Sequence, residues 1–170
     1  MKDTVIMNCF GFGRRCSSGF FVLAFLAAVA AQGQNYQLHS VYMYSFTRYV
    51  QWPDEMGKGD FVISVVGDSP IFEELRHMAE VKKVGDRPIK ISRISGASDL
   101  KPCNILFLPA DKSALLGDLV SKIGTASTLI VTEQTGLGAK GSAINFVIRE
   151  GKLALELNQS TLNKHKLKAS

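Results

Sequence analysis

Cysteine is scarce in this sequence, which has three cysteines among 170 residues. An odd and small number of cysteines excludes a disulfide-rich scaffold. The excess of positive charge is also modest: the net charge is +5, and no run of like charges exceeds two residues. Proteins that bind nucleic acid carry a stronger basic patch, so we expect no nucleic acid as a partner.

The sequence also lacks the clustered histidines, cysteines or carboxylates that hold a metal ion. Its three histidines, His39, His77 and His165, are far apart, and neither H-E-x-x-H nor C-x-x-C occurs. We interpret these histidines as surface residues, and we expect neither a metal nor another cofactor.

Long hydrophobic runs are limited to one, at residues 19–30, and three basic residues and one acid precede it. This run is too short to span a bilayer, which takes about 20 residues. It ends in an A-x-A pattern at residues 28–30, and this order of segments is typical of a secretory signal peptide. We therefore expect residues 1–30 to be a cleaved signal peptide, residues 31–170 to be one mature domain, and the protein to be periplasmic.

Beyond residue 30, helical and strand patterns alternate along the chain. Apolar residues at helical spacing predict helices, whereas β-branched or alternating runs predict strands. The predicted helices cover residues 36–50, 70–78, 111–123 and 159–167, and the predicted strands cover residues 61–66, 88–94, 104–108 and 128–132. This alternation indicates a single α/β domain with a mixed, partly parallel sheet flanked by helices.

A C-terminal β-hairpin completes the predicted sheet. Apolar residues at 144, 146 and 148 alternate with Asn145, Val147 and Arg149, and a second alternating run follows Glu150-Gly151. The pattern predicts a two-stranded ribbon with one apolar face and one mostly polar face. Asn145 and Arg149, on the polar face, are candidate partner contacts, and bonding a turn is the structural alternative for Asn145.

One glycine-rich motif resembles a nucleotide-binding signature. Residues 136–141 read G-x-G-x-x-G, a fingerprint that needs a helix to begin there and face a pyrophosphate. A predicted strand follows instead. We interpret the motif as a connection between two strands.

Gly67-Asp68-Ser69, directly after a predicted strand, resembles the nucleophile block of lipase-like hydrolases. Such enzymes need a histidine base with an orienting acid, and no Asp-x-x-His occurs near the C-terminus. We interpret Asp68 or Ser69 as a helix cap before Pro70. An anion site at this helix start is a second possibility, and a hydrolase that uses Ser69 is a remote one.

Two single residues also stand out. Trp52 is the only tryptophan and lies beside Pro53 at the end of an aromatic helix. It belongs either to the core, which we favour, or to a partner-binding patch. Cys103 directly precedes an apolar strand, so we expect it to be buried.

Four blocks of the chain resemble, in the same order, the YfiR family of periplasmic proteins. The first is an aromatic helix that ends in Trp-Pro, and the last leads into the hairpin. The blocks are residues 39–53, 65–70, 103–108 and 141–146. Together they extend over nearly all of the chain beyond the signal peptide.

The resemblance implies a regulator and not an enzyme. Proteins of this family are repressors that bind the periplasmic part of an inner-membrane diguanylate cyclase, keep cyclic-di-GMP synthesis low and so restrain biofilm formation. The expected partner here is such a cyclase or the periplasmic domain of a sensor kinase, and the resemblance also implies a homodimer. A periplasmic small-molecule binding domain is the alternative function. The candidate partner or ligand contacts are Trp52, Asp68, Ser69, Asn145 and Arg149.

The chain departs from the family pattern at two places. The resemblance implies a pair of cysteines in some members, and here Ser64 stands at the first position while Cys103 stands at the second. A structural disulfide at this place, and redox sensing through it, are therefore not expected. The family also continues beyond the region of residues 166–170, so a truncated C-terminus and a member without this tail both stay open.

Overall fold

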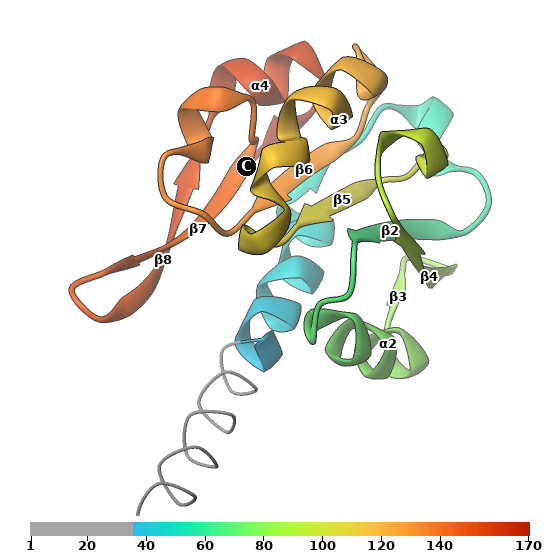
Figure 1. Ribbon diagram of the computed structural model, residues 1–170. Coiled ribbons are helices and arrows are strands. Elements are labelled where there is room, and N and C mark those ends of the chain that lie inside the picture. Colours follow the sequence, from blue (N-terminus) through green and yellow to red (C-terminus); the bar gives the residue numbers. More distant parts are fainter. Residues whose placement is uncertain (1–35) are drawn as a thin grey trace, which may run out of the picture. The chain divides into compact units, whose positions relative to one another are not determined.

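Seven strands form one sheet in the order β3-β4-β2-β5-β6-β7-β8 (Figure 1). The computed structural model describes residues 36–170, and the predicted signal peptide lies outside the described residues. The strands are β2 (Phe61–Val66), β3 (Lys83–Val84), β4 (Arg87–Ile94), β5 (Ile105–Leu108), β6 (Leu129–Thr132), β7 (Ile144–Arg149) and β8 (Lys152–Leu157). This arrangement confirms the predicted α/β domain with a mixed sheet and a C-terminal hairpin.

The five inner strands β4, β2, β5, β6 and β7 run parallel, and β3 and β8 pair antiparallel at the two edges. The central strands are mostly apolar and buried on both faces, as expected for a parallel sheet that helices cover. Their register aligns Ile63 with Ile105 and Ile105 with Leu129. These three side chains are fully buried, so the core centres on the middle of the sheet.

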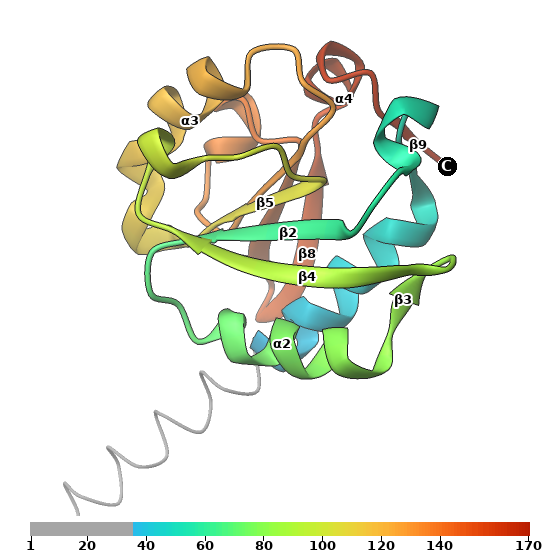
Figure 2. The same cartoon turned by 90° about the vertical axis from the view of Figure 1, so that its right-hand side faces the viewer.

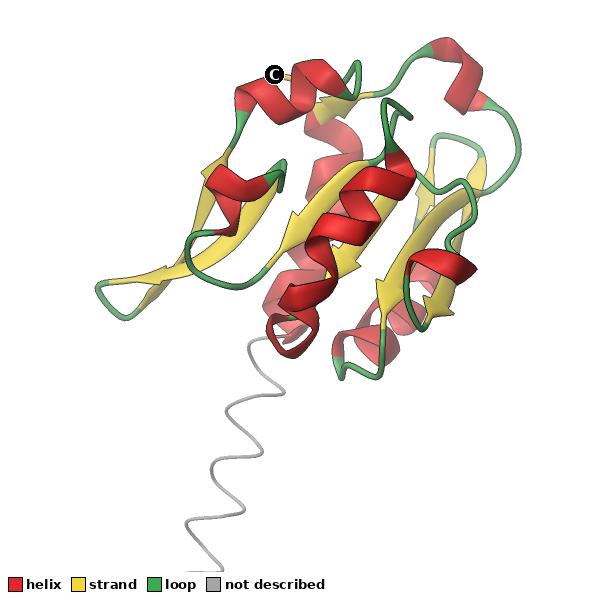
Figure 3. Ribbon diagram, turned by 45° about the horizontal axis from the view of Figure 1, so that its top comes forward, coloured by secondary structure: helices red, strands yellow, loops and turns green. Residues whose placement is uncertain are grey.

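Helices cover both faces of the sheet (Figures 2 and 3). The helix at residues 36–49 and α2 (Ile71–Val81) share one apolar cluster with the β2 side chains Ile63 and Val65. On the other face, α3 (Leu116–Ile123) packs in a second cluster with Val66 and Leu106. Within residues 36–170, no helix is both long enough and apolar enough to cross a membrane.

The strand order reverses between β2 and β5. From β2 the chain passes through α2 to β4 on one side, and it then returns past β2 to β5 and continues through α3 to β6. In open α/β sheets, ligands bind outside the carboxyl ends of the strands at such a reversal. The residues that follow β2, β5 and β6 are therefore the first place to search for a site.

The C-terminal segment differs from the predicted helix over residues 159–167. The last elements are α4 (Gln159–Lys164) and β9 (Lys168–Ala169), which pairs antiparallel with β1 (Val50–Gln51). Lys166 adopts a left-handed backbone with φ 56°, and the Leu167 amide donates to the Leu162 carbonyl. This bond is typical of a Schellman motif, which ends a helix. Glycine is the usual residue at this left-handed position. Because a lysine stands there instead, the sequence did not predict that the helix ends before it.

Candidate functional site

The carboxyl ends of the parallel strands gather polar residues at the point where the strand order reverses. Asp68 and Ser69 follow β2, Ala110 follows β5, and Glu133 directly follows β6. The helix at residues 36–49 reaches the same edge, because the Tyr36 hydroxyl donates a hydrogen bond of 3.1 Å to Glu133 Oε1. We call Tyr36, His39, Ser69 and Glu133 the carboxyl-edge cluster.

Glu133 is the acid at the centre of this cluster. Its Oε1 also accepts the Ala110 backbone amide at 3.1 Å, and only 10% of its side chain is exposed. Burial raises the pKa of Glu133, although these two hydrogen bonds oppose the shift. Burial and the nearby Glu133 also raise the pKa of Tyr36. Sequence reasoning missed Glu133, and the available signal was an acid placed directly after a buried strand.

His39 lies beside Glu133 inside the protein. Its Nδ1 is 3.6 Å from Glu133 Oε2 and has no hydrogen-bond partner within the described part of the chain. The ring stacks on Phe146 at 4.2 Å, and burial lowers the pKa of His39 to about 4. His39 is therefore neutral near pH 7, and its contact with Glu133 is not an ion pair there.

The interpretation of all three histidines as surface residues is wrong. His39 is 6% exposed and His165 is fully buried, whereas the side chain of His77 is 68% exposed. His165 Nδ1 contacts the Ala126 carbonyl oxygen at 2.8 Å, so this histidine fixes a turn next to α4. His39 sits on the apolar face of the helix at residues 36–49, and His165 directly follows α4, so the short sequence pattern does not distinguish either from its apolar neighbours.

The predicted cap at Asp68 or Ser69 is also wrong. α2 begins at Ile71 with Pro70 in the N-cap position, and no side chain caps it. Asp68 instead forms an ion pair of 3.1 Å with Arg93 at the surface. Ser69 is 5% exposed, and its hydroxyl has no partner at good hydrogen-bond geometry in the described residues, although it lies near enough to the Tyr36 hydroxyl to oppose the rise in the pKa of Tyr36.

The geometry of this cluster does not support the remote alternative of a hydrolase. A serine nucleophile needs a hydrogen bond to a base, usually a histidine. Ser69 Oγ makes no such bond in residues 36–170, although His39 lies in the same cluster. The described residues also contain no group of three His, Cys, Asp or Glu side chains that could hold a metal ion.

Asn145 has no exposed surface and joins β7 to both of its neighbours. Thr132 Oγ1 on β6 lies 2.6 Å from Asn145 Oδ1, and Asn145 Nδ2 donates to Glu156 Oε2 on β8 at 3.0 Å. The Ser142 hydroxyl lies 2.8 Å from Thr132 Oγ1. The side chain therefore holds the hairpin to the parallel sheet from inside.

Arg149 and Trp52 occupy different surroundings. The side chain of Arg149 is 68% exposed and donates a hydrogen bond of 3.0 Å to Glu156 near the hairpin end. Trp52 is half-buried, donates to the Asn104 carbonyl at 3.2 Å and packs edge-on against Phe61. Trp52 thus contributes to the core, and Arg149 is available at the surface.

The hairpin of β7 and β8 projects from the body of the domain (Figures 1 and 3). Its register places Ile148, Leu155 and Leu157 on one face, together with the buried Phe146. The helix at residues 36–49 covers Phe146 through His39 and Phe46, but Ile148, Leu155 and Leu157 are 61%, 40% and 53% exposed. We call these three residues the hairpin surface. Grouped exposed apolar side chains often mark an interaction site.

Comparison with protein families matches residues 36–170 to the family described as YfiR/HmsC-like. The match begins at the first described residue and includes the carboxyl-edge cluster, the hairpin and the C-terminal strand β9. No curated protein matches the chain.

Proposed function

The chain belongs to the YfiR/HmsC-like family, and on that premise we propose that it is a repressor of an inner-membrane signalling protein. In this proposal the domain binds the periplasmic part of a membrane diguanylate cyclase, lowers cyclic-di-GMP synthesis and so restrains biofilm formation. The periplasmic domain of a sensor kinase is the other partner that fits. The family is periplasmic and regulatory and is not known for an enzyme activity, which agrees with this role.

The hairpin surface is the observation that supports partner binding. Ile148, Leu155 and Leu157 lie on one face of a projecting ribbon, and all three are at least 40% exposed. Exposed apolar side chains gain free energy when a partner removes them from water, by about 25 cal/mol per Å². Arg149 lies on the opposite face near the tip, where it can meet an acidic group at the rim of the contact.

Repression by such contact is a shift of population. A receptor with active and inactive states moves toward the state that a ligand binds more tightly, and by no more than the difference in affinity. The domain therefore represses only if the hairpin surface fits the inactive receptor better than the active one. Release of the domain then restores synthesis of the second messenger.

A homodimer could form through the edge strand β8 of the same hairpin. β8 ends the sheet, so one side of its backbone has no partner strand in the described domain. An edge strand can pair with another strand, and a second copy is one source of it. Dimer formation through β8 would then compete with, or arrange, the binding of the membrane partner.

A small-molecule site is the second candidate function, and the carboxyl-edge cluster favours it. Ser69 Oγ and His39 Nδ1 are buried without hydrogen bonds, and Asp68 lies just outside them. Buried polar atoms normally have partners, so a bound ligand at this edge would supply what the described residues do not. Such a ligand would set the affinity for the membrane partner.

Deletion of the gene tests the proposed function. We expect cyclic-di-GMP to rise in the deletion strain and to return to its former level when the exported protein is restored. Co-expression with membrane cyclases encoded nearby identifies the partner. Unchanged cyclic-di-GMP and unchanged activity of every such partner would refute the proposal.

A further inference from the structure

The connection between β4 and β5 leaves part of the sheet uncovered. The crossovers on both sides of it contain α2 and α3, but residues 95–104 contain only the short turn η2 (Ala97–Asp99). A groove of about 690 Å³ therefore lies over β2 and β4 on the face that carries α3. Its floor includes Val62 and Ser64 of β2 and Ser92 of β4.

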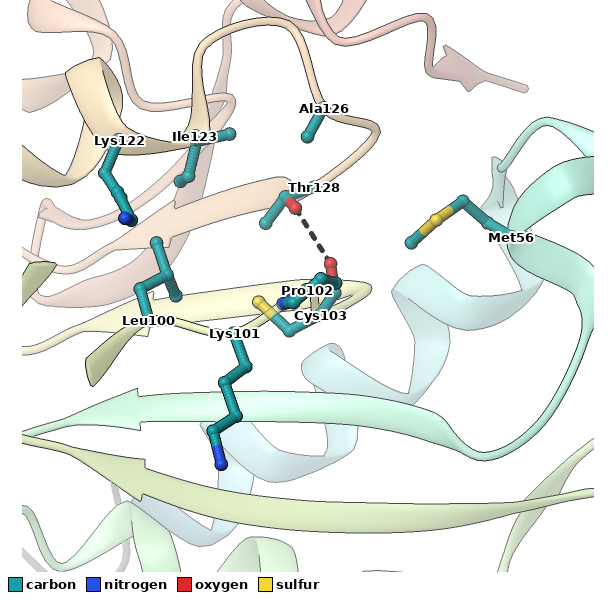
Figure 4. A pocket seen from close by; sticks show the side chains of 9 residues that line it. All are labelled: Met56, Leu100, Lys101, Pro102, Cys103, Lys122, Ile123, Ala126 and Thr128. Atoms are coloured by element: carbon teal, nitrogen blue, oxygen red, sulfur yellow. Dashed lines mark hydrogen bonds between the residues drawn. The ribbon is translucent and has the colours of Figure 1, made fainter. Parts of the chain in front are cut away.

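A second hollow of about 350 Å³ adjoins this groove (Figure 4). The two share Leu100, Lys101 and Pro102 as a common wall. The second hollow is mostly apolar, and Figure 4 shows Met56 standing across it from Leu100 and Lys122. One molecule with an apolar part and a polar part could occupy both spaces.

The floor of the groove contains a partly buried polar contact. The Ser64 and Ser92 hydroxyls are 2.8 Å apart, so one of them donates to the other and leaves a further O–H free to donate. Cys103 lies on the wall of the adjoining hollow, and burial raises the pKa of its thiol to about 11. The single cysteine of the described residues is thus a neutral thiol beside the serine pair, and Ser92 faces the groove.

The rim of the groove is positively charged. Lys90 and Lys101 line it, and Lys122 lines the adjoining hollow. None of these three lysines lies within ion-pair distance of a carboxylate of residues 36–170. Figure 4 shows the Lys101 side chain pointing away from Ala126, toward the strands that floor the groove.

The one acid on the groove wall is already engaged. Asp99 accepts the Ser95 amide at 3.2 Å and lies 3.3 Å from the Ser98 hydroxyl, so it closes its own turn. Arg93 also lines the groove, but Asp68 already pairs with it at 3.1 Å and compensates its charge. The groove therefore offers two lysine ammonium groups and several hydroxyls, and its single carboxylate, Asp99, forms no ion pair with either lysine.

We propose that this groove binds a small organic anion, whose carboxylate or phosphate contacts Lys90 and Lys101 and whose neighbouring polar group bonds Ser92. An apolar part of the ligand extends past Leu100 into the adjoining hollow. Lysine binds carboxylates and phosphates as a point charge, and hydroxyls add direction to the contact. The inference deepens the proposed function, because it supplies a ligand that could control the repressor.

Calorimetric titration of the purified exported protein tests the site. Citrate serves as the carboxylate probe and glycerol 3-phosphate as the phosphate probe, with sodium sulfate as the control for nonspecific anion binding. We expect saturable binding of at least one organic probe, with an affinity that falls as salt screens the lysines. No saturable binding of either probe, or equal binding of sulfate, would overturn the proposal.

Matched variants locate the binding. The double variant Lys90→Gln/Lys101→Gln is expected to lose at least tenfold in affinity, and Ser92→Ala is expected to lose a smaller factor. The control Lys58→Gln/Lys140→Gln removes two exposed lysines that lie outside the groove. Equal affinity in the groove variant and the control would overturn the proposal.

The same variants separate this site from the proposed function. If the protein binds the anion normally but does not repress in cells, the proposed repression is refuted, whereas the proposed anion site is not. If the groove variant loses anion binding but still represses in cells, control of the repressor through this ligand is refuted, whereas the proposed repression is not.

Discussion

The Tyr36 hydroxyl bonds to Glu133 across 97 positions of sequence, at 3.1 Å. This bond fastens the helix at residues 36–49 to the carboxyl edge of the sheet, and His39 lies one turn further along the same helix. Burial lowers the pKa of His39 and raises that of Glu133, so we expect the stability of the folded domain to depend on pH through both groups.

Protonation of His39 is expected to destabilise the protein. Its pKa falls from 6.5 to about 4 on folding, so the unfolded chain binds a proton first as the pH drops. The free energy of unfolding therefore falls between about pH 6.5 and pH 4, by roughly 3 kcal/mol at most for this group. Urea unfolding at a series of pH values measures this slope.

The variant His39→Gln should flatten that slope, whereas the exposed control His77→Gln should leave it unchanged. His165 contributes with the same sign in both variants, because burial also lowers its pKa. Glu133 acts oppositely: its raised pKa makes its contribution largest at low pH and lost as the pH rises. Glu133→Gln should therefore steepen the fall toward acid. An unchanged slope in His39→Gln contradicts the account.

The effect of Ser69→Ala on the free energy of unfolding shows whether the Ser69 hydroxyl caps a helix or is buried without a hydrogen-bond partner. Loss of a capping serine costs about 1 kcal/mol. Ser69 does not cap α2, and its hydroxyl is buried without a partner. We therefore expect Ser69→Ala to leave the free energy of unfolding unchanged or to raise it. A loss of 1 kcal/mol or more in denaturant unfolding would show that the hydroxyl makes a stabilising bond.

Asn145→Ala should destabilise the domain by about 1–3 kcal/mol, because it leaves buried hydrogen-bonding groups without partners. The lost contacts are those to Thr132 and Glu156. The matched control is Arg149→Ala, which removes another partner of Glu156 from an exposed position and should cost no more than about 0.5 kcal/mol. Equal effects of the two variants would show that Asn145 does not hold the hairpin.

Much of the fold was predictable because strong local patterns decide it. The continuous apolar runs around Ile63, Ile105 and Leu129 are typical of strands that are buried on both faces of a parallel sheet. The alternation from Ile144 onward likewise predicted the hairpin, but not its burial, because Asn145 on the predicted polar face is buried whereas Ile148 and Leu155 on the apolar face are exposed. The glycine-rich residues 136–141 also proved to be a connection, which forms the short turn η4 (Leu137–Lys140) between β6 and β7.

Long-range relationships were not predictable in the same way. The pairing of Val50 with Ala169 joins the end of the first helix to the C-terminal residues, and a strand of two residues is too short to show a sequence period. The approach of His39 and Tyr36 to Glu133 depends on how a helix docks, which local spacing does not fix. The sequence pointed to Asp68 and Ser69 at the carboxyl edge of the sheet, but it interpreted them as a helix cap, and no side chain caps α2.

The central claim is that the hairpin surface binds and represses a membrane signalling partner. The most direct test compares cyclic-di-GMP in cells that export Leu155→Asp with cells that export Val81→Asp, a change at an exposed valine on α2, away from the hairpin. Circular dichroism should show that both variants fold. The account predicts high cyclic-di-GMP with Leu155→Asp and normal repression with Val81→Asp. Normal repression by a folded Leu155→Asp variant would contradict it.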